Sequence, residues 1–446
     1  GSRATGTAYL FANALGNESG RIIFDGQRVI ATGGEVVARG DHLSFREFAL
    51  TEAILDIETM RMRRARTFSL EAGMDTTRVV ELPFEWKEQS EPVAVPHHLP
   101  PPFMSKEDEF ARAVALGLHD YMRKSRSRGF VVSLSGGADS AATAILAALS
   151  VKLPLIELGE DELRRRLEYL DWNPEKLCGG LLHTVYQASE NSGQVTRDAA
   201  RSLAEALESR HSEWEIGELV TEYRKLVEKS LGREMTWETD DIPLQNIQAR
   251  VRSPGIWMLA NVHYALLLAT SNRSEAAVGY ATMDGDTSGS LAPIAGIDKN
   301  YLRKWLKWIA HEGPASIGPV RGLQPIVDLA PTAELRPAKM KQVDEDDLMP
   351  YDFLDAVERL AIRDRFEPRE VVEALRHDWE ERVGGREKYL MYIDRFFRLW
   401  ARNQWKRERY APSFHLDDKN LDPKTWCRFP ILSGGFRDEL EELRGE

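Results

Sequence analysis

The first part of the chain alternates short apolar runs with turn residues. Three β-rich runs, at 21–25, 28–31 and 35–38, are separated by an Asp-Gly pair and a Gly-Gly pair, and a further apolar run lies at 53–57. Such pairs favour tight hairpin turns, because glycine adopts positive φ angles at little cost. The pattern predicts strands and tight turns from residue 8 to about residue 85.

Prolines then interrupt this pattern. Five prolines fall between residues 91 and 102, and neither a helix nor a central strand accepts so many residues that lack a backbone N–H. After them, Ser105 stands before Lys-Glu-Asp, a combination that favours a helix start. We expect one domain over residues 1–90, a linker over 91–105, and a second domain over 106–446 whose first helix runs towards Arg128.

Beyond the linker, strand-like and helix-like segments alternate. We expect strands at 130–134, 181–185 and 265–269, and helices at 140–150, from about Asn246, at 298–311 and through most of the tail from Tyr351. This alternation is typical of a parallel sheet with helices on both faces. The predicted fold class of the second domain is therefore α/β, with a doubly wound parallel sheet.

Composition and charge narrow the classes of function. The 446 residues are 42% hydrophobic and 29% charged, as in folded globular proteins, and no apolar run approaches the roughly 20 residues of a membrane helix. The formal charge of -12 argues against a nucleic-acid or membrane partner, because phosphate surfaces attract basic faces. Cys178 and Cys427 are the only cysteines, which excludes a disulfide framework and favours a reducing, cytoplasmic compartment. We expect Cys178 to pack near the start of a strand.

A glycine-containing loop carries the strongest chemical signal. It comes directly after the strand expected at 130–134 and directly before a helix, so its glycines allow a tight turn and a close approach to a ligand, while the helix N-terminus supplies free N–H groups. We predict a pyrophosphate cradle; the alternative is a turn that uses glycines for geometry alone. The loop lacks the lysine of the P-loop pattern. Its residues are Ser133, Leu134, Ser135, Gly136, Gly137, Ala138, Asp139 and Ser140.

The string Ser-Gly-Gly-Ala-Asp-Ser resembles the SGGxDS loop of the N-type ATP pyrophosphatases, which cleave ATP between its α- and β-phosphates. NAD synthetases, GMP synthetases, asparagine synthetases and tRNA-thiolating enzymes share this loop. Further motifs resemble those of NAD synthetases: N-x-x-A-R-x-R at 246–252, T-S-N-R-S-E at 270–275, G-I-D-K at 296–299, and P-T-A-E-L at 331–335 with Q-V-D-E at 342–345. The resemblance implies an adenine nucleotide α-hydrolase-like fold for the second domain.

The first domain resembles part of a nitrilase-like glutaminase. Residues 9–26 are similar to the later part of the nitrilase-like α/β sandwich in glutamine-dependent NAD synthetases. That domain uses a Glu, Lys and Cys triad, and the sequence holds no cysteine before Cys178. We expect the triad to lie on a preceding segment, and the 446 residues alone to use free ammonia rather than glutamine.

The resemblance implies an ATP-dependent amidation of deamido-NAD to NAD, through an acyl-adenylate, with AMP and pyrophosphate as the other products. Metal ions and lysines suit a reaction in which two anions must be positioned and neutralised. It also implies a homo-oligomer built on a synthetase-domain dimer. The implied roles are catalysis for Asp139 and Lys299; ATP binding for the loop with Thr270, Lys299 and Thr332; Mg²⁺ binding for Asp139 and Glu275; and deamido-NAD binding for Asn246, Arg250, Glu275, Tyr280, Met283, Lys406 and Arg407.

The sequence departs from the family pattern at two positions. Members commonly have T-K-[YF] and an aspartate seven residues after the lysine, whereas this chain has Met283 and Ser290 there. We expect the substrate to be held differently, through Asp284 or Asp286. The basic pair at 406–407 has a plainer interpretation as a solvated helix face.

Two other functions fit the loop. One is another SGGxDS ligase, such as a tRNA-modifying enzyme, which the net charge of -12 disfavours. The other is a non-catalytic nucleotide-binding subunit, which the metal-binding carboxylate pair disfavours.

Overall fold

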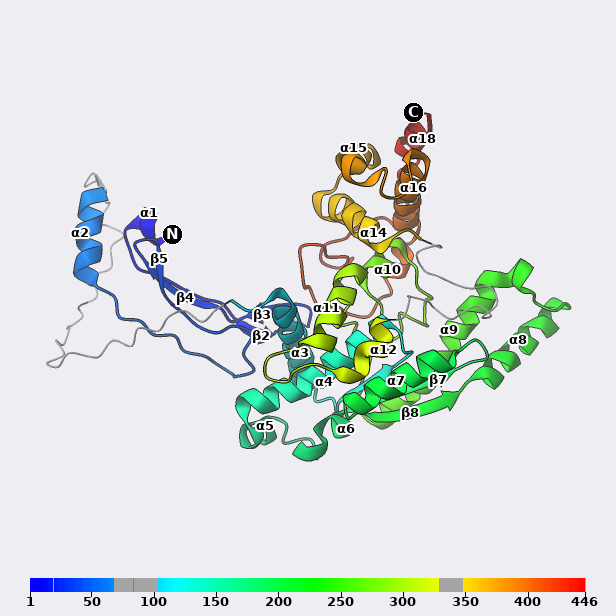
Figure 1. Cartoon of the computed structure of the whole chain (residues 1–446), viewed down its shortest axis with the longest axis horizontal. Coiled ribbons are helices and arrows are strands. Elements are labelled where there is room, and N and C mark those ends of the chain that lie inside the picture. The colour runs from blue at the N-terminus through cyan, green and yellow to red at the C-terminus, as the bar shows by residue number, and fades with distance from the viewer. Residues whose placement is uncertain (19, 68–82, 84–102, 329–347, 446) are drawn as a thin grey trace. The chain divides into compact units, whose positions relative to one another are not determined.

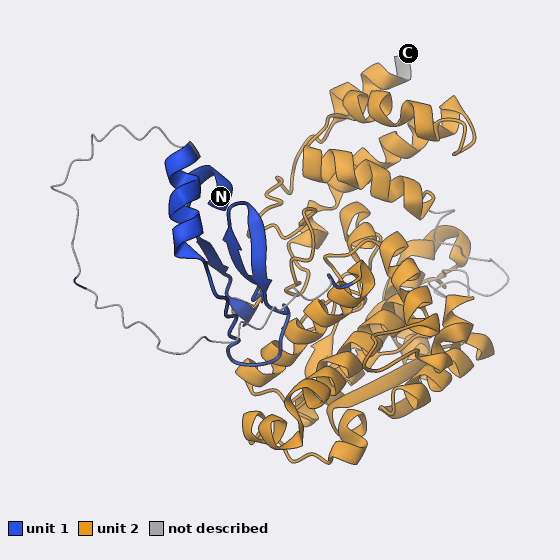
Figure 2. Cartoon of the chain, turned by 60° about the vertical axis from the view of Figure 1, so that its left-hand side comes forward, with its two compact units in different colours: residues 1–16, 24–104 blue, residues 17–23, 105–446 orange. Residues whose placement is uncertain are grey.

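The structure, a computed structural model, describes residues 1–18, 20–67, 83, 103–328 and 348–445. The chain forms two compact units (Figure 2). The first contains Gly1–Gly16 and Phe24–Met104, and the second contains Asn17–Ile23 and Ser105–Glu446. Most of the expected linker lies outside the described residues.

The first unit contains a small antiparallel sheet. Its strands β1 (Tyr9–Ala12), β4 (Arg28–Thr32) and β5 (Glu35–Arg39) pair in the order β1-β4-β5, and Gly33 and Gly34 turn the chain with positive φ angles. Helix α1 is Ser2–Thr5, and β2 (Leu15–Asn17) pairs with β3 (Ile23–Asp25) in a separate two-stranded sheet. The expectation of strands and turns throughout was wrong at residues 57–67, which form helix α2 (Ile57–Thr67).

A four-stranded parallel sheet organises the second unit (Figure 1). Its strands β6 (Phe130–Ser133), β7 (Leu182–Ala188), β8 (Arg210–Glu215) and β9 (Leu266–Leu268) lie in the order β8-β7-β6-β9, and every pairing is parallel. The three predicted strands are present, with ends shifted by at most three residues. Strand β8 was not predicted, because this edge strand has the polar sequence Arg-His-Ser-Glu-Trp-Glu and few buried side chains.

Helices pack on this sheet and confirm the α/β prediction. Helix α9 (Trp237–Val262) buries Ile256 and Ala260 against Val131, Val185 and Leu267 of three adjacent strands. Helix α4 (Ala138–Leu158) packs on β6 and β7, and α3 (Lys106–Ser125) packs on α4. The remaining elements of this region are α5 (Glu160–Arg166), η2 (Pro174–Lys176), α6 (Leu177–Leu181), α7 (Gln194–Ala206), α8 (Gly217–Leu231), α10 (Arg273–Val278), α11 (Lys299–His311), η3 (Arg321–Leu323) and α12 (Gln324–Val327).

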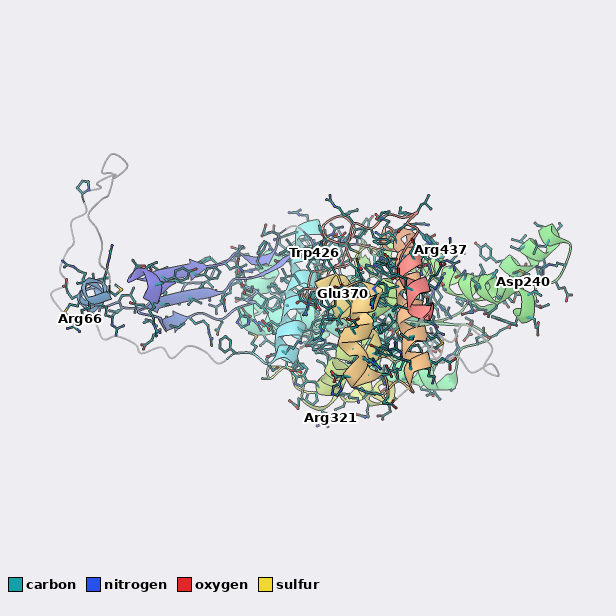
Figure 3. The ribbon with its side chains drawn as sticks, turned by 90° about the horizontal axis from the view of Figure 1, so that it is seen from above. Arg66, Asp240, Arg321, Glu370, Trp426 and Arg437 are labelled. Carbon is teal, nitrogen blue, oxygen red and sulfur yellow. The ribbon has the colours of Figure 1, made fainter. Side chains whose placement is uncertain are left out.

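Side-chain caps mark the starts of α3 and α9. The Ser105 side chain accepts a hydrogen bond from the Asp108 N–H at the start of α3, as the sequence predicted. Helix α9 begins nine residues before the predicted Asn246, where Thr236 caps it. Asp240 is non-helical and kinks the helix, so Pro243 falls in the first turn of the longer segment that follows, where proline is tolerated. Figure 3 labels Asp240 on this helical segment. Two hydrogen bonds from Arg233, of 2.7 and 2.8 Å, fix its carboxylate there.

Helix α4 corrects the expectation about long apolar runs. Its 21 residues are long and apolar enough to span a membrane by length and composition, and it is the one such helix in the described part of the chain. Most of it is buried inside the second unit, between α3, β6 and α11. A buried core helix passes the same test of length and composition, and α4 is such a helix. Cys178 is buried in α6, directly before β7, as expected.

The predicted helical tail is present and packs around a core that it shares with α10. Phe353, Tyr389, Phe396, Phe397 and Trp400 are among its buried side chains. Glu370 closes a capping box at the start of α15, where its carboxylate accepts from the Glu367 N–H. The elements are α14 (Tyr351–Glu358), a π-helical turn (Arg359–Asp364), α15 (Pro368–Trp379), α16 (Arg386–Arg402), α17 (Gln404–Arg407) and α18 (Arg437–Gly445).

Candidate functional site

A cavity of about 780 Å³ opens at the carboxyl ends of β6, β7 and β9 in the second unit. The glycine loop, the residues after β9, the start of α11 and one side of α9 line it. Ligands of open α/β sheets bind outside the carboxyl ends of the strands, so the cavity lies where this fold places a ligand.

The glycine loop forms one wall of the cavity. Gly136 has φ 82°, and a Cβ there would lie 2.2 Å from the carbonyl oxygen of Thr196, so no other residue fits without moving α7. Ser140 donates to the Gly137 carbonyl at 3.1 Å, and its Oγ lies 3.0 Å from that of Ser135. Gly137 caps α4 without a side chain, so the first amides of this long helix are left for a ligand.

The structure brings most of the predicted loop residues to the cavity. Leu134 is the exception: it is fully buried, and its N–H donates to the Val185 carbonyl at 2.9 Å. Leu134 therefore anchors the loop to the sheet, and its assignment as an ATP contact stays a prediction. The lining residues are Ser133, Ser135, Gly136, Gly137, Ala138, Asp139 and Ser140.

Lys299 lies between two carboxylates at the loop. Its ammonium donates to Asp139 and, at 3.2 Å, to Glu275, although the residue is only 3% exposed. Asn272 donates to the other oxygen of Asp139 at 3.0 Å and caps α10 through the Glu275 N–H, also at 3.0 Å. These contacts bring together the glycine loop and two segments more than a hundred residues further along the chain, as the sequence motifs predicted.

A second group of predicted residues also lines the cavity. Asn246 accepts from Thr282 Oγ1 at 3.0 Å, and Thr270 and Tyr280 also face the space. Lys406 donates to the carbonyls of Gly279 and Ala281 at 2.6 and 2.9 Å. Burial lowers the pKa of Lys406, and the charge of Asp286 opposes that shift.

Three predicted substrate contacts do not line this cavity. Arg250 donates to the Met283 carbonyl at 3.0 Å, and Met283 itself is buried. Arg407 is buried and donates to the carbonyls of Ala277 and Trp400. The contacts described join these residues to the main chain, and their part in binding deamido-NAD stays a prediction. Thr332 lies outside the described residues.

The cavity distinguishes the two acids considered as replacements for the missing family residues. Asp286 lines it, accepts from the Thr282 N–H at 2.7 Å, and has a pKa raised by burial. Asp284 is exposed and pairs with Arg409 at 2.8 Å. Of the two, Asp286 is in the position to contact a ligand.

Several cationic residues of the site were not predicted from the sequence. Arg303 and Lys307 of α11 line the cavity beside Lys299, and Arg252 faces it from α9. Positions i, i+4 and i+8 share one side of a helix, so the spacing within 298–311 was a usable signal. Gln187, at the end of β7, accepts from Ser133 and donates to the Arg252 carbonyl. Five basic and four acidic side chains line the cavity, so its own carboxylates offset much of this positive charge.

The described residues contain no cluster of three or more His, Cys, Asp or Glu side chains arranged as metal ligands. Asp139 and Glu275 nevertheless converge on one ammonium group. Two carboxylates are a fitting protein share for Mg²⁺, which takes its other ligands from substrate phosphates and water.

A parallel sheet, a glycine loop that opens a helix and a lysine between two acids define an α/β domain built to hold a polyphosphate. Comparison with known proteins makes this specific: the family model for NAD synthase matches residues 110–387, and the chain belongs to that family. It is 32% identical to the glutamine-dependent NAD(+) synthetase of Oryza sativa, over 93% of this chain and 60% of that one. It is 29% identical to the human glutamine-dependent NAD(+) synthetase, over 96% of this chain and 64% of that one.

Solved structures agree with this assignment. A glutamine-dependent NAD(+) synthetase from Cytophaga hutchinsonii is 41% identical, with a TM-score of 0.78, over 99% of this chain and 66% of that one. The enzyme from Acinetobacter baumannii, solved with ADP, shares the fold at 19% identity and a TM-score of 0.53. The chain thus spans about three fifths to two thirds of the length of these relatives.

Proposed function

We propose that the chain amidates deamido-NAD to NAD at the expense of ATP, through an acyl-adenylate, with release of AMP and pyrophosphate. The observation that carries this proposal is the contact of Lys299 with Asp139 and Glu275 beside the glycine loop. Membership of the NAD synthase family supports the same reaction.

In the first step, a carboxylate oxygen of the nicotinate group attacks the α-phosphorus, and the bond to the bridging oxygen of the β-phosphate breaks. The loop amides and the hydroxyls of Ser135 and Ser140 would hold the phosphates, and Lys299 would neutralise the charge that moves onto pyrophosphate. Arg303 and Lys307 extend this positive side of the cavity along α11. Most of the protein's work here is orientation and charge stabilisation.

Mg²⁺ would be held by Asp139 and Glu275 together with phosphate oxygens. When bound, it would draw negative charge from the phosphate oxygens and so assist attack at phosphorus. Asn272 fixes the Asp139 carboxylate through a hydrogen bond of 3.0 Å. Lys299 then competes for the same carboxylates, so its ammonium would turn towards the phosphates as the substrates bind.

In the second step, ammonia attacks the acyl carbon, AMP departs with the electrons of the acyl–oxygen bond, and the attacking nitrogen loses one proton to water. Asn246, Tyr280 and Lys406 would hold deamido-NAD in the cavity, and Asp286 would accept from a hydroxyl of its ribose.

The test uses the 446-residue chain with ATP, deamido-NAD, Mg²⁺ and an ammonium salt. AMP, pyrophosphate and NAD should appear in equal amounts. Formation of ADP and phosphate would contradict the proposed reaction.

We also propose that the nitrogen comes from glutamine in a complete enzyme, as the names of the relatives state for them, and from ammonia for these 446 residues alone. Both cysteines of the sequence are buried, and burial raises the pKa of the Cys178 thiol to about 11 and raises that of Cys427. Neither is a thiolate suited to attack an amide. Glutamine-driven NAD formation by this chain alone would contradict this part of the proposal.

A homo-oligomer built on a synthetase-domain dimer completes the proposal. Helix α8 exposes Leu219, Tyr223 and Leu226 at a spacing that puts them on one side of the helix. An apolar side of this kind favours burial against a second copy. Light scattering should give a dimer or larger assembly, and Leu226→Glu should shift it towards monomer.

A further inference from the structure

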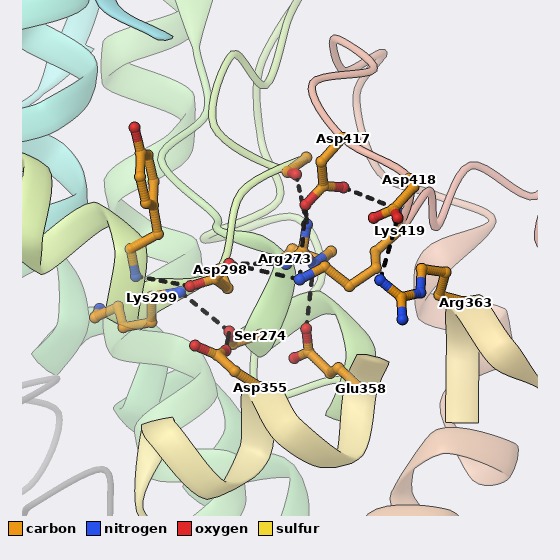
Figure 4. A network of polar contacts seen from close by, with 12 residues as sticks. Arg273, Ser274, Asp298, Lys299, Asp355, Glu358, Arg363, Asp417, Asp418 and Lys419 are labelled. Atoms are coloured by element: carbon orange, nitrogen blue, oxygen red, sulfur yellow. Dashed lines mark hydrogen bonds and ion pairs between the residues drawn. The ribbon is translucent and has the colours of Figure 1, made fainter. Parts of the chain in front are cut away.

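A buried charge network lies behind the reaction site, centred on Arg273 (Figure 4). Arg273 is fully buried, and its guanidinium donates to three carboxylates: Glu358 at 3.1 Å, Asp298 at 2.9 Å and Asp417 at 2.6 Å. It also donates to the Gly296 carbonyl at 2.8 Å. All three nitrogens of the guanidinium therefore donate at least one hydrogen bond.

The network joins the two segments that carry Glu275 and Lys299. Arg273 stands two residues before Glu275, and its partners Gly296 and Asp298 stand directly before Lys299. The Arg273 N–H also donates to the Ile297 carbonyl at 2.8 Å. The start of α10 is thereby fixed to the start of α11 through both main chain and side chain.

Asp355 of α14 adds a second link to the same place. It accepts from Ser274 Oγ at 3.2 Å, and Ser274 Oγ in turn accepts from the Lys299 N–H at 3.1 Å. Burial, together with the charges of Glu358 and Asp298, raises the pKa of Asp355 to about 10, so its carboxyl group is neutral at pH 7 and can share a proton with Asp298. Asp298 accepts from Arg273 with one carboxylate oxygen, and with the other it caps α11 by accepting from the Tyr301 N–H at 2.7 Å.

Stability alone is a weak explanation for this arrangement. Buried ion pairs contribute little net stability, because the loss of hydration offsets their attraction, and apolar residues of similar size often stabilise as well or better. Neither Arg273, Asp355 nor Glu358 lines the cavity, so none of them is placed to contact a ligand there. Their contacts are instead with the segments that carry Glu275 and Lys299, at the starts of α10 and α11.

We propose that Arg273 and Asp355 are positioning residues for Lys299 and Glu275, and that through them α14 and residues 417–419 of the tail set the geometry of the reaction site. This inference rests on the proposed function for its kinetic test, and a second test is independent of that function. Displacement of a catalytic group by about 1 Å can lower a rate by about 10²-fold, so a loosened network should reduce kcat more than it raises KM.

The first test measures Lys299 without any turnover. In the native chain its ammonium is engaged by Asp139 and Glu275, and acetic anhydride should label it slowly; mass spectrometry of peptides gives the rate. The double variant Arg273→Met/Glu358→Gln removes both charges of the most buried pair. We expect it to label Lys299 at least about threefold faster at a temperature where circular dichroism shows the native fold. Arg398→Met is the matched control, because Arg398 pairs with Asp394 on α16 at 2.8 Å and, among the described residues, makes no contact with the network.

The second test compares two substitutions of Asp355 in the ammonium-dependent reaction. Asparagine resembles the protonated carboxyl group in shape and can donate to Asp298, so Asp355→Asn should keep kcat within about twofold. Asp355→Ala should lower kcat about tenfold or more, while the KM for ATP changes less than about twofold. This pair also decides the matter if the double variant does not fold.

Faster labelling in the double variant together with rescue by Asp355→Asn would support the inference. Unchanged labelling in a folded double variant, or equal kcat values for the alanine and asparagine variants, would overturn it. If the native chain makes no NAD, the proposed function fails, and labelling of Lys299 in the double variant and in Asp355→Ala still decides the positioning role. A merely structural network would lower the melting temperature and leave both readouts unchanged.

Discussion

Replacing Asp355 by asparagine should change how the stability of the chain depends on pH. In an unfolded chain this carboxyl group titrates near pH 3.8, whereas in the folded structure burial and the neighbouring charges of Glu358 and Asp298 raise its pKa to about 10. Between these values the folded state holds one proton more than the unfolded state. The contribution of Asp355 to stability is therefore fully present below about pH 4 and is lost as the pH rises towards 10.

The magnitude comes from that single proton. A difference of one bound proton changes the free energy of unfolding by at most about 1.4 kcal/mol per pH unit. Asparagine carries no such proton, so from pH 6 to pH 8 the stability of Asp355→Asn should rise relative to the native chain by up to about 2.7 kcal/mol. The neighbouring acids titrate in concert with Asp355, which makes this value an upper bound.

The assay is urea unfolding of the native and variant chains at pH 6, 7 and 8 and constant ionic strength, monitored by far-ultraviolet circular dichroism. The control is Asp378→Asn, because Asp378 is an exposed acid on α15. Its curve should run parallel to that of the native chain. A parallel curve for Asp355→Asn as well would refute a neutral, buried carboxyl group at this position.

Three further substitutions test the site. Lys299→Met should lower kcat by about two to three orders of magnitude through loss of a preorganised charge, whereas Lys304→Met, exposed on the same helix, should leave it unchanged; equal effects would contradict the assignment. Glu275→Gln should lower turnover about 10²-fold and raise the Mg²⁺ concentration needed for half-maximal rate, and a native Mg²⁺ dependence would remove it as a metal ligand. Lys406→Met should raise the KM for deamido-NAD more than that for ATP, as initial rates would show; the reverse order would place this lysine at the wrong substrate.

Local sequence signals predicted the framework of the second unit because each depends on a few adjacent residues. The loop between β6 and α4 needs glycine at 136, where a side chain would meet the Thr196 carbonyl, and a serine cap begins α3. Strand β8 was missed because this edge strand is polar and has no continuous apolar run.

Side-chain direction was harder to predict than position along the chain. Arg250 and Arg252 are two residues apart on α9, and only Arg252 lines the cavity, because successive helix positions face different sides. Arg407 lies next to Lys406, yet its guanidinium donates to main-chain carbonyls inside the protein. The partners of Arg273 come from segments up to 144 residues away, and no local pattern identifies such contacts.

The length and apolarity of α4 have a consequence for how the chain folds during synthesis. Residues 138–158 leave the ribosome after α3 but before β7, α11 and α12, which also pack on this helix. Until α11 at residues 299–311 has been made, part of a strongly apolar helix has no partner in the growing chain, and exposed surfaces of this kind associate with one another. The helix whose first amides open onto the cavity is therefore also one that needs protection from aggregation while the second unit is incomplete.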